Sequence, residues 1–431
     1  MVSLTSSKEK RILMLTAFFA VALAGTGIAL AAPKAQTTPA PSTTVSQSEQ
    51  FGSPNSSVNI ISDTEIIIDG VTHNSWEEVA QSGYYQQIDT RCGTDALVLQ
   101  AVNDIQESAG TPSDCSFSRT RIMPEYEPSV EKYRIPVVVH IIQRTSGTGA
   151  ISDSRVHSQI EILNEDFQAM AGTNGAPGTD AQIEFYLAEF DPAGNPTTGI
   201  TRSSNNTWYN DGGSYWNTLA WDTNRYLNIY TNSASGALGY VPNLPQGGIA
   251  GSNSDRVVIL HSTFGRNAPF NPFHLGRTVT HEVGHYLGLE HTFTGGCSNS
   301  YTSGDLIMDT NPESSPTSGC PSNRTSCGSQ APFHNYMDYS DDICMNQFTP
   351  EQNNRMRCSL LNYRPNLYEL TDGPCSGADF AAPFGELDFF DISAFITQFS
   401  NGDPSGDVNG DGSHDFFDIS AFLTVFSAGC P

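Results

Sequence analysis

Residues 281–291, which read HEVGHYLGLEH, combine side chains that could hold a metal ion with a carboxylate beside them. Positions i and i+4 of an α-helix share one face, so His281 and His285 can direct imidazole nitrogens at one zinc ion about 2.0–2.1 Å away. Gly288 can turn the backbone sharply after the helix and bring His291 to the same ion. One coordination position would then stay open for water.

Glu282 follows the first of these histidines and is the candidate general base. Its carboxylate could take a proton from zinc-bound water and later pass it to a leaving amine. A helix with two surface histidines would explain H-E-x-x-H alone, but the added glycine and third histidine rarely occur by chance. The pattern therefore predicts a zinc-dependent hydrolytic site.

The length and the first residues indicate an exported chain with two or three folding units. Three cationic residues, Lys8, Lys10 and Arg11, precede an apolar run, so residues 1–31 are predicted to be a signal peptide. An uncleaved membrane anchor is the alternative, because about 20 apolar residues can span a bilayer. We expect a secreted or extracellular protein, with attachment at a cell surface as a further option, and no membrane span after signal cleavage.

The net charge is −26, and three of the four lysines lie at or before Lys34. This acidity makes nucleic acid and anionic lipid poor partners. We interpret it as a source of solubility and calcium affinity rather than as a field that steers substrates.

Composition predicts a disordered linker, an amino-terminal unit, a second unit and a tail, at residues 32–59, 60–121, 122–370 and 375–431, respectively. In the amino-terminal unit we expect a strand at 65–69 and helices at 74–81 and 96–107. For the second unit, four strands are expected at 135–142, 183–189, 226–231 and 256–260. Ser152, Gly276 and Thr349 are placed to begin its helices. This order indicates an α+β unit with a mixed sheet and helices on one side.

Nine cysteines in an exported chain suggest disulfides, and the odd number leaves at least one thiol outside any intrachain pair. Four lie in a Gly- and Ser-rich region and permit three connectivities: Cys297, Cys320, Cys327 and Cys344. Cys375 and Cys430 bracket the tail. The others are Cys92, Cys115 and Cys358.

The segment Asn335–Asp342 (NYMDYSDD), read together with the histidine motif, resembles the metzincins, and within them the pappalysin family. The resemblance covers roughly residues 88–369 and implies a metzincin-like zinc endopeptidase with a twisted mixed sheet, an active-site helix and a disulfide-held subdomain. It implies that Met337 forms an apolar turn beneath the zinc and that the Tyr339 hydroxyl stabilises the oxyanion. Alone, Met337 would be a core residue and Tyr339 a surface aromatic.

Arg91-Cys92-Gly93-Thr94 resembles the latency motif of this family, in which the cysteine thiolate fills the open zinc position. A disulfide between Cys92 and Cys115 is the alternative. Activation of such a zymogen would need a cut after the unit, and residues 119–121 (Arg-Thr-Arg) look like an exposed basic site for it.

The same resemblance suggests pairing Cys297 with Cys327 and Cys320 with Cys344, and it gives Cys358 no counterpart. Some relatives prefer a basic residue after the scissile bond. Matching carboxylates could come from Asp341 or Asp342, which could equally lie in a solvated acidic loop or bind calcium. Asp305 and Asp309 are further candidates for a structural calcium ion.

The tail contains an exact repeat, DFFDISAF, at residues 388–395 and 415–422. Before the second copy, oxygen donors follow the spacing of a calcium loop, with Ser413 donating its backbone carbonyl: Asp407, Asn409, Asp411, Ser413, Asp415 and Asp418. The first copy departs from this spacing, because Phe380 and Ala382 occupy ligand positions 1 and 3. Asp379 and Asp388 are therefore expected to bind calcium weakly or not at all.

Duplicated loop-helix units of this length resemble dockerins that end in Gly-Cys-Pro, which implies a small all-α, calcium-binding tail. A Cys375–Cys430 disulfide would staple it, since so small a domain has little core. Its phenylalanines could dock a cohesin-like partner, or could simply form its core.

The sequence therefore predicts a secreted zinc endopeptidase that acts on proteins or peptides, is made as a zymogen and is anchored by its tail. An inactive metzincin scaffold that serves as an adhesin is the alternative, and Glu282 argues against it because a scaffold does not need a base. A calcium-stabilised surface protein would leave the histidine motif without a purpose.

Overall fold

The computed structural model describes residues 58–86, 91–94, 114–128, 132–371, 376–381 and 387–429. The chain divides into residues 1–48, which lie outside this description, and residues 49–431. The predicted signal peptide, the helix at 96–107 and the Cys375–Cys430 pair also fall outside the described residues. Within these residues no helix has the length and apolar character needed to cross a membrane.

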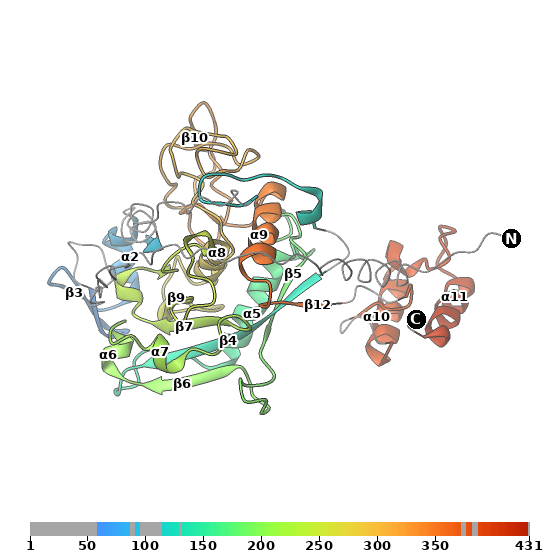
Figure 1. The fold of residues 1–431 in the computed structure, drawn as a ribbon, viewed down its shortest axis with the longest axis horizontal. Coiled ribbons are helices and arrows are strands. Elements are labelled where there is room, and N and C mark those ends of the chain that lie inside the picture. Colours follow the sequence, from blue (N-terminus) through green and yellow to red (C-terminus); the bar gives the residue numbers. More distant parts are fainter. Residues whose placement is uncertain are drawn as a thin grey trace, which may run out of the picture. The chain divides into compact units, whose positions relative to one another are not determined.

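A seven-stranded mixed sheet forms the centre of the second unit, in the order β12-β4-β7-β9-β8 with β5 and β6 also paired to β4 (Figure 1). Its strands are β4 (Lys132–Gln143), β5 (Ile183–Leu187), β6 (Ile200–Ser204), β7 (Leu227–Asn232), β8 (Gly239–Tyr240), β9 (Val257–Leu260) and β12 (Glu369–Thr371). The strands β5, β6 and β7 run parallel to β4, whereas β8 and β12 run antiparallel to their neighbours. The predicted mixed sheet is confirmed.

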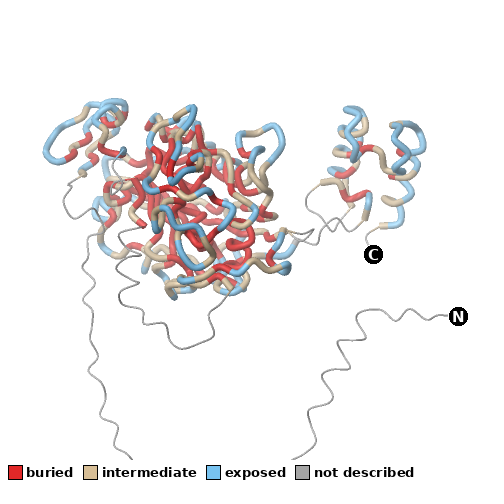
Figure 2. Tube along the Cα trace, turned by 90° about the horizontal axis from the view of Figure 1, so that it is seen from above, coloured by how far each residue is buried: buried red, intermediate tan, exposed pale blue. Residues whose placement is uncertain are grey.

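Alternation along β4 sends its side chains to two different cores. Val137, Val139 and Ile141 join the core that also contains residues of the helices α5 (Asp153–Phe167), α8 (Arg277–Tyr286) and α9 (Pro350–Tyr363). Ile142 instead joins aromatic residues that surround the four-residue helices α6 (Asn206–Tyr209) and α7 (Trp216–Leu219). Buried positions are concentrated in this unit in Figure 2.

The residues predicted to begin the three long helices do so. The Ser152 side chain accepts from the backbone N–H of Arg155, and Thr349 forms a capping box with Gln352. Gly276 precedes α8 in the left-handed conformation, with φ of 81°, which glycine adopts without strain.

The amino-terminal unit consists of β1 (Val58–Ser62), β2 (Glu65–Ile68), β3 (Val71–His73) and α2 (Trp76–Gln81). The strands form an antiparallel meander, and β1 begins inside the predicted linker. The unit shares its core with the second unit, because Trp76 stacks on Phe270 with ring centroids 4.8 Å apart.

Three disulfides are present among the described residues. Cys297 bonds to Cys327 and Cys320 to Cys344, which confirms the pairing suggested by the resemblance. These two hold a loop-rich lobe that contains β10 (Thr325–Ser326) and β11 (Ser329–Gln330). The third joins Cys115 to Cys358, so the alternative disulfide between Cys92 and Cys115 is wrong.

The tail contains two helices, α10 (Phe389–Asn401) and α11 (Phe416–Ala428), and each begins with a capping box formed by two aspartates of the repeat. Phe395 and Phe422 stack with centroids 4.1 Å apart and form its core. The paired phenylalanines that begin each helix are exposed instead: Phe389, Phe390, Phe416 and Phe417.

Candidate active site

The three histidines of the motif converge. His281 and His285 lie one turn apart on α8, and Gly288, with φ of 93°, turns the chain so that His291 returns to them. The Nε2 atom of His281 lies 3.1 Å from those of His285 and His291, and the latter two are 3.0 Å apart. All three residues are buried.

The hydrogen bonds of the other ring nitrogens fix how two of these imidazoles face the centre. The Nδ1 of His281 donates to the carbonyl of Tyr336 at 2.6 Å, and that of His285 donates to the carbonyl of Leu289 at 2.8 Å. A neutral imidazole whose Nδ1 carries the hydrogen presents a bare Nε2 lone pair. Burial lowers the pKa of His281 well below its usual value. Converging lone pairs repel unless a cation lies among them, and ligands at about 2.0–2.1 Å around tetrahedral zinc are about 3.3 Å apart. The donor set therefore fits zinc.

The helix that carries two of these histidines is held by a buried carboxylate from α5. Asp166 forms an ion pair with Arg277 at 3.0 Å and accepts hydrogen bonds from Thr280 and from the Tyr336 hydroxyl at 2.6 and 2.8 Å. Burial raises the pKa of Asp166 to about 6, against the opposing effect of Arg277. Because Tyr336 also accepts from His281, this contact links α5, α8 and the turn at Met337.

Met337 lies directly beneath α8. A Cβ atom on Gly284 would come within 2.5 Å of the Met337 sulfur, so a larger residue there would displace the Met337 side chain. The ring of Tyr339 packs against His291 and His281, with centroid separations of 4.9 and 5.8 Å. The structure thus brings both predicted turn residues to the histidines.

The segment 91–94 lies across this site. The Cys92 thiol and the three histidines form the one group, among the residues described, of three or more such side chains close enough to hold a metal ion, with ligand atoms within 4.8 Å of one another. Gly93 donates its N–H to the Gly239 carbonyl at 3.0 Å, and Leu238 donates to Arg91 at 2.9 Å. The segment therefore runs as a short parallel extension beside β8.

Glu282 is buried under the same segment. Its carboxylate accepts a hydrogen bond from the Thr94 hydroxyl at 3.3 Å. On the other side, a Cβ atom on Gly239 would lie 2.8 Å from its Cγ. Thr94 also accepts from the backbone N–H of Val241, so it bridges the residue after β8 and the predicted base.

Arg91 lines the pocket beside Cys92, together with Glu282, Tyr339 and Asp342. Its guanidinium donates to the carbonyls of Tyr339 and Ser340 and lies 4.4 Å from the Phe273 ring centroid. Burial lowers the pKa of Arg91, and Asp342 opposes this most strongly. The Asp342 carboxylate also accepts the backbone N–H groups of Leu275 and Arg277 at the start of α8. The sequence did not indicate this contact.

Comparison with known proteins addresses the family. Residues 199–361 match a peptidase family described as pregnancy-associated plasma protein-A. An extracellular metalloprotease of Colletotrichum graminicola is 39% identical over 240 residues, which are 53% of this chain and 77% of the relative. The extracellular metalloprotease 1 of Coccidioides posadasii is 39% identical over 237 residues, with 52% and 76% covered. The chain belongs to this family of extracellular metalloproteases.

A solved structure agrees with the metalloprotease fold. A mutant of Tannerella forsythia promirolysin is similar, with a TM-score of 0.52 and 35% identity over 64% of this chain and 96% of that one. As its family indicates, the metalloprotease is secreted.

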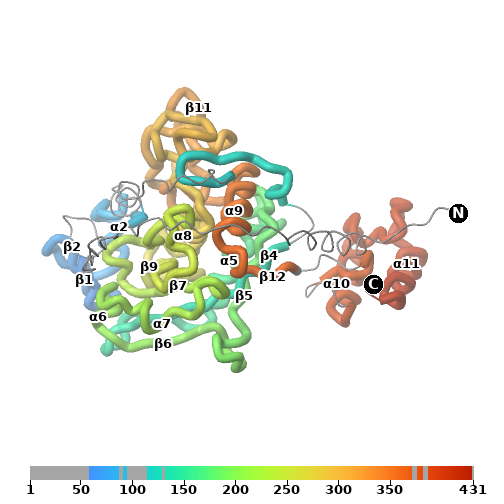
Figure 3. Tube along the Cα trace, viewed as in Figure 1, coloured from blue at the N-terminus to red at the C-terminus, as the bar shows by residue number. Residues whose placement is uncertain are grey.

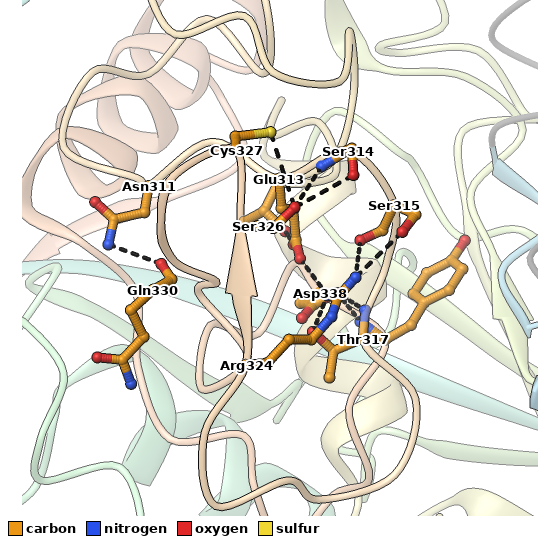
Figure 4. Close-up of polar contacts among 12 residues, drawn as sticks. Asn311, Glu313, Ser314, Ser315, Thr317, Arg324, Ser326, Cys327, Gln330 and Asp338 are labelled. Atoms are coloured by element: carbon orange, nitrogen blue, oxygen red, sulfur yellow. Dashed lines mark hydrogen bonds and ion pairs between the residues drawn. The ribbon is translucent and has the colours of Figure 1, made fainter.

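A second polar network of the metalloprotease lies in the disulfide lobe around Glu313 and Arg324 (Figure 4). Thr292, the residue that follows His291, also contacts this network. Glu313 is fully buried, accepts from the Thr292 hydroxyl at 2.7 Å and pairs with Arg324 at 2.7 Å. Burial raises the pKa of Glu313 to about 8, and the charge of Asp338 adds to this effect. Sequence reasoning missed this network because its members are far apart along the chain.

The other acidic candidates of the metalloprotease already have hydrogen-bond partners. Asp305 accepts from Thr310 and from the backbone of Ile307 at 2.7 and 3.1 Å, and burial raises its pKa to about 7. Asp309 accepts the backbone N–H of Glu351 at 3.0 Å. Calcium binding at these residues stays a prediction.

In the tail, the side-chain oxygens that are predicted to bind calcium in the second loop accept hydrogen bonds from backbone N–H groups of the same loop. Asp407 accepts the backbone N–H groups of Asp411 and Gly412 at 3.1 and 2.7 Å. Asp418 accepts those of Asn409 and Asp415 at 3.1 and 2.9 Å. Calcium binding by this loop also stays a prediction.

The first loop has a different register from the one that the repeat suggested. Asp391, the counterpart of Asp418, accepts the backbone N–H of Ala381 at 2.8 Å. Ala381, and not Ala382, is therefore the counterpart of Asn409, and Asp379 stands where Asp407 does. The first loop is one residue longer, and its third position has no side-chain oxygen.

Proposed function

We propose that this metalloprotease is a pappalysin-like zinc endopeptidase that hydrolyses peptide bonds within proteins. The observation that supports this proposal most strongly is the convergence of three Nε2 atoms within 3.1 Å of one another, with Glu282 buried beside them. Under this proposal His281, His285 and His291 hold the zinc ion. A bound zinc ion would supply Lewis-acid chemistry, lowering the pKa of a water molecule and polarising the substrate carbonyl.

The side chains of the chain have separate tasks in this proposal. Glu282 accepts the proton of the attacking water and returns it to the leaving amine, which requires no other acid. The Tyr339 hydroxyl donates to the oxygen that becomes negative in the tetrahedral intermediate. Met337 supports the zinc ligands from below by packing, without ligating the ion.

The zymogen proposal rests on the contacts of residues 91–94. The Cys92 thiol lies within 4.8 Å of the histidine ligand atoms and would supply the fourth ligand, Arg91 lines the neighbouring pocket and Thr94 donates to Glu282. A substrate therefore could not reach the histidines while this segment is in place. The similarity to promirolysin, a zymogen by its name, supports the same proposal.

The tail is proposed to be a dockerin-like calcium-binding domain that anchors the enzyme to a cohesin-like partner. Its duplicated helices and exposed phenylalanine pairs support this role. Proteins and peptides are the proposed substrates.

The test is a digestion assay. The mature protein, purified from culture, is incubated with denatured proteins, with and without a zinc chelator, and new termini are mapped by mass spectrometry. Cleavage inside chains that stops with the chelator and returns with zinc supports the proposal. A zinc-loaded mature protein that cuts nothing would instead support the inactive adhesin scaffold.

A further inference from the structure

Residues 114–126 lie against α9 and the disulfide lobe, although those up to residue 121 belong to the unit predicted to leave on activation (Figure 3). The backbone N–H of Thr120 donates to the Tyr301 carbonyl at 2.8 Å. Asn354 of α9 donates to the Met123 carbonyl at 2.9 Å. Tyr126 packs on the Cys115–Cys358 disulfide. The segment is thus attached to the second unit both covalently and by hydrogen bonds.

Arg355 of α9 connects this segment to the histidine motif. Its Nε donates to the Gly288 carbonyl at 2.8 Å. Nη1 donates to the Thr120 hydroxyl at 2.6 Å, and Nη2 donates to the Ser116 carbonyl at 3.0 Å. One guanidinium therefore binds the turn that precedes His291 and the segment 116–120 together.

The Arg355 side chain is fully buried, so its hydrogen bonds matter energetically. A buried charge is costly unless its donors are satisfied. Burial lowers the pKa of Arg355, which shows how unfavourable its surroundings would be for the charge alone. If residues 114–126 left, two of the three guanidinium nitrogens would lose these acceptors, and the Gly288 turn would lose a firmly held support.

A single cut at the expected activation site, residues 119–121, would not release the amino-terminal unit. Thr120 is buried and only Arg121 of residues 119–121 is well exposed, which corrects the expectation of an exposed basic site. A cut at these residues would also leave everything up to Cys115 joined to Cys358. It would not free residues 91–94 from the molecule.

We propose that residues 114–126 are a permanent part of the active enzyme and that Arg355, held by Thr120 and Ser116, is a positioning residue for the Gly288 turn. The catalytic unit then begins before Cys115 and not at residue 122. This inference rests on the proposed function, because it concerns the form that cleaves peptides.

The first test uses the active enzyme matured by its own host and purified without reductant. Its intact mass and amino-terminal sequences are measured before and after reduction. We expect every active molecule to contain Cys115, within one chain or as a disulfide-linked peptide. Active enzyme whose mass lacks Cys115 would overturn the proposal, whereas an inactive preparation would count against the proposed function instead.

The second test separates positioning from general support. Thr120→Val in the full chain removes one acceptor of Arg355 while keeping the side-chain volume, and Thr218→Val on the exposed face of α7 is the matched control. After maturation we expect Thr120→Val to lower kcat by roughly three- to tenfold with little change in KM, and to speed zinc loss to a chelator. Lower thermal stability with unchanged kcat and zinc release would reduce Arg355 to a structural role and overturn the positioning part.

Discussion

The chain contains two predicted metal sites that differ in how far the folded protein prepares them. At the histidine site, the carbonyls of Tyr336 and Leu289 orient two rings and a packed core surrounds them. In the loop from Asp407 to Asp418, the carboxylates accept the loop's own N–H groups. The first site holds its ligands in place before the ion binds. In the second, calcium would have to compete with the loop's own hydrogen bonds.

The difference follows from where each set of ligands obtains its support. The histidine motif is supported by side chains from α5, from the Met337 turn and from the disulfide lobe. The tail loop is supported by its own hydrogen bonds, between residues within twelve positions of each other. Long-range packing fixes side chains independently of the ion, but a local loop has few other constraints.

His291→Ala should give the largest change, because it leaves only two protein ligands at the prepared site. We expect zinc to be lost on dialysis and peptidase activity to disappear with it, as measured by elemental analysis and a peptide assay. His157→Ala, on the surface of α5, should retain both. If His291→Ala kept both zinc and activity, His291 would not be a required ligand, and the proposed description of the histidine site would be wrong.

Glu282→Gln should retain zinc but lower kcat by roughly 10²- to 10⁴-fold, since the ligands remain and the proposed base is gone. Zinc content and peptide hydrolysis are measured on the same sample, with Glu161→Gln, on the exposed face of α5, as the matched control. Activity close to that of the parent would show that another group accepts the proton.

Asp407→Ala addresses the second site. Calcium at about 100 times its Kd should stabilise the tail by roughly 2.7 kcal/mol if it binds only the folded form. Asp407→Ala should remove most of this gain, which calorimetry of the full chain would show in the transition of the tail. Asp379→Ala should change little, because Ala381 offers no side-chain oxygen. Equal losses in the two variants would mean that both loops bind alike.

A smaller effect is expected from Glu313, which supports the prepared site through Thr292. Its folded pKa, about 8, is raised above the usual value by burial. The resulting stability is complete below the unfolded pKa, near 4.5, and is lost as the pH rises through about 8. One proton can account for at most about 1.4 kcal/mol per pH unit.

Thermal unfolding of the full chain between pH 5 and pH 8 tests this expectation. The parent should lose stability across the range, and Glu313→Gln should flatten the loss. Glu161→Gln, on the exposed face of α5, is the control. An unchanged slope in Glu313→Gln would place the titrating group elsewhere.

Local signals in the sequence predicted the parts of the fold that depend on neighbours along the chain. Ser152 and Thr349 cap their helices as expected, and the i, i+4 spacing placed His281 and His285 on one face. These features need only backbone geometry within one or two turns.

Contacts between distant segments could not be read in the same way. Cys115 and Cys358 are 243 residues apart, and nothing near either one specifies the other. The pairing of Cys92 with Gly239 involves a strand of two residues, too short for any hydrophobic alternation. The exact repeat also failed to predict the register of the first tail loop, because the extra residue lies in the loop and not in the identical segments.

The core shared by the amino-terminal unit and the rest of the enzyme has a consequence for handling the latent form. Trp76, Tyr84 and Tyr85 pack in one cluster with Phe270 and Phe273, so apolar contacts hold part of this interface, beside hydrogen bonds such as that between Asp63 and His261. Apolar association weakens on cooling and strengthens with sulfate or phosphate salts. The latent form should therefore show the most residual peptidase activity at low temperature and low salt. Ammonium sulfate should suppress this residual activity.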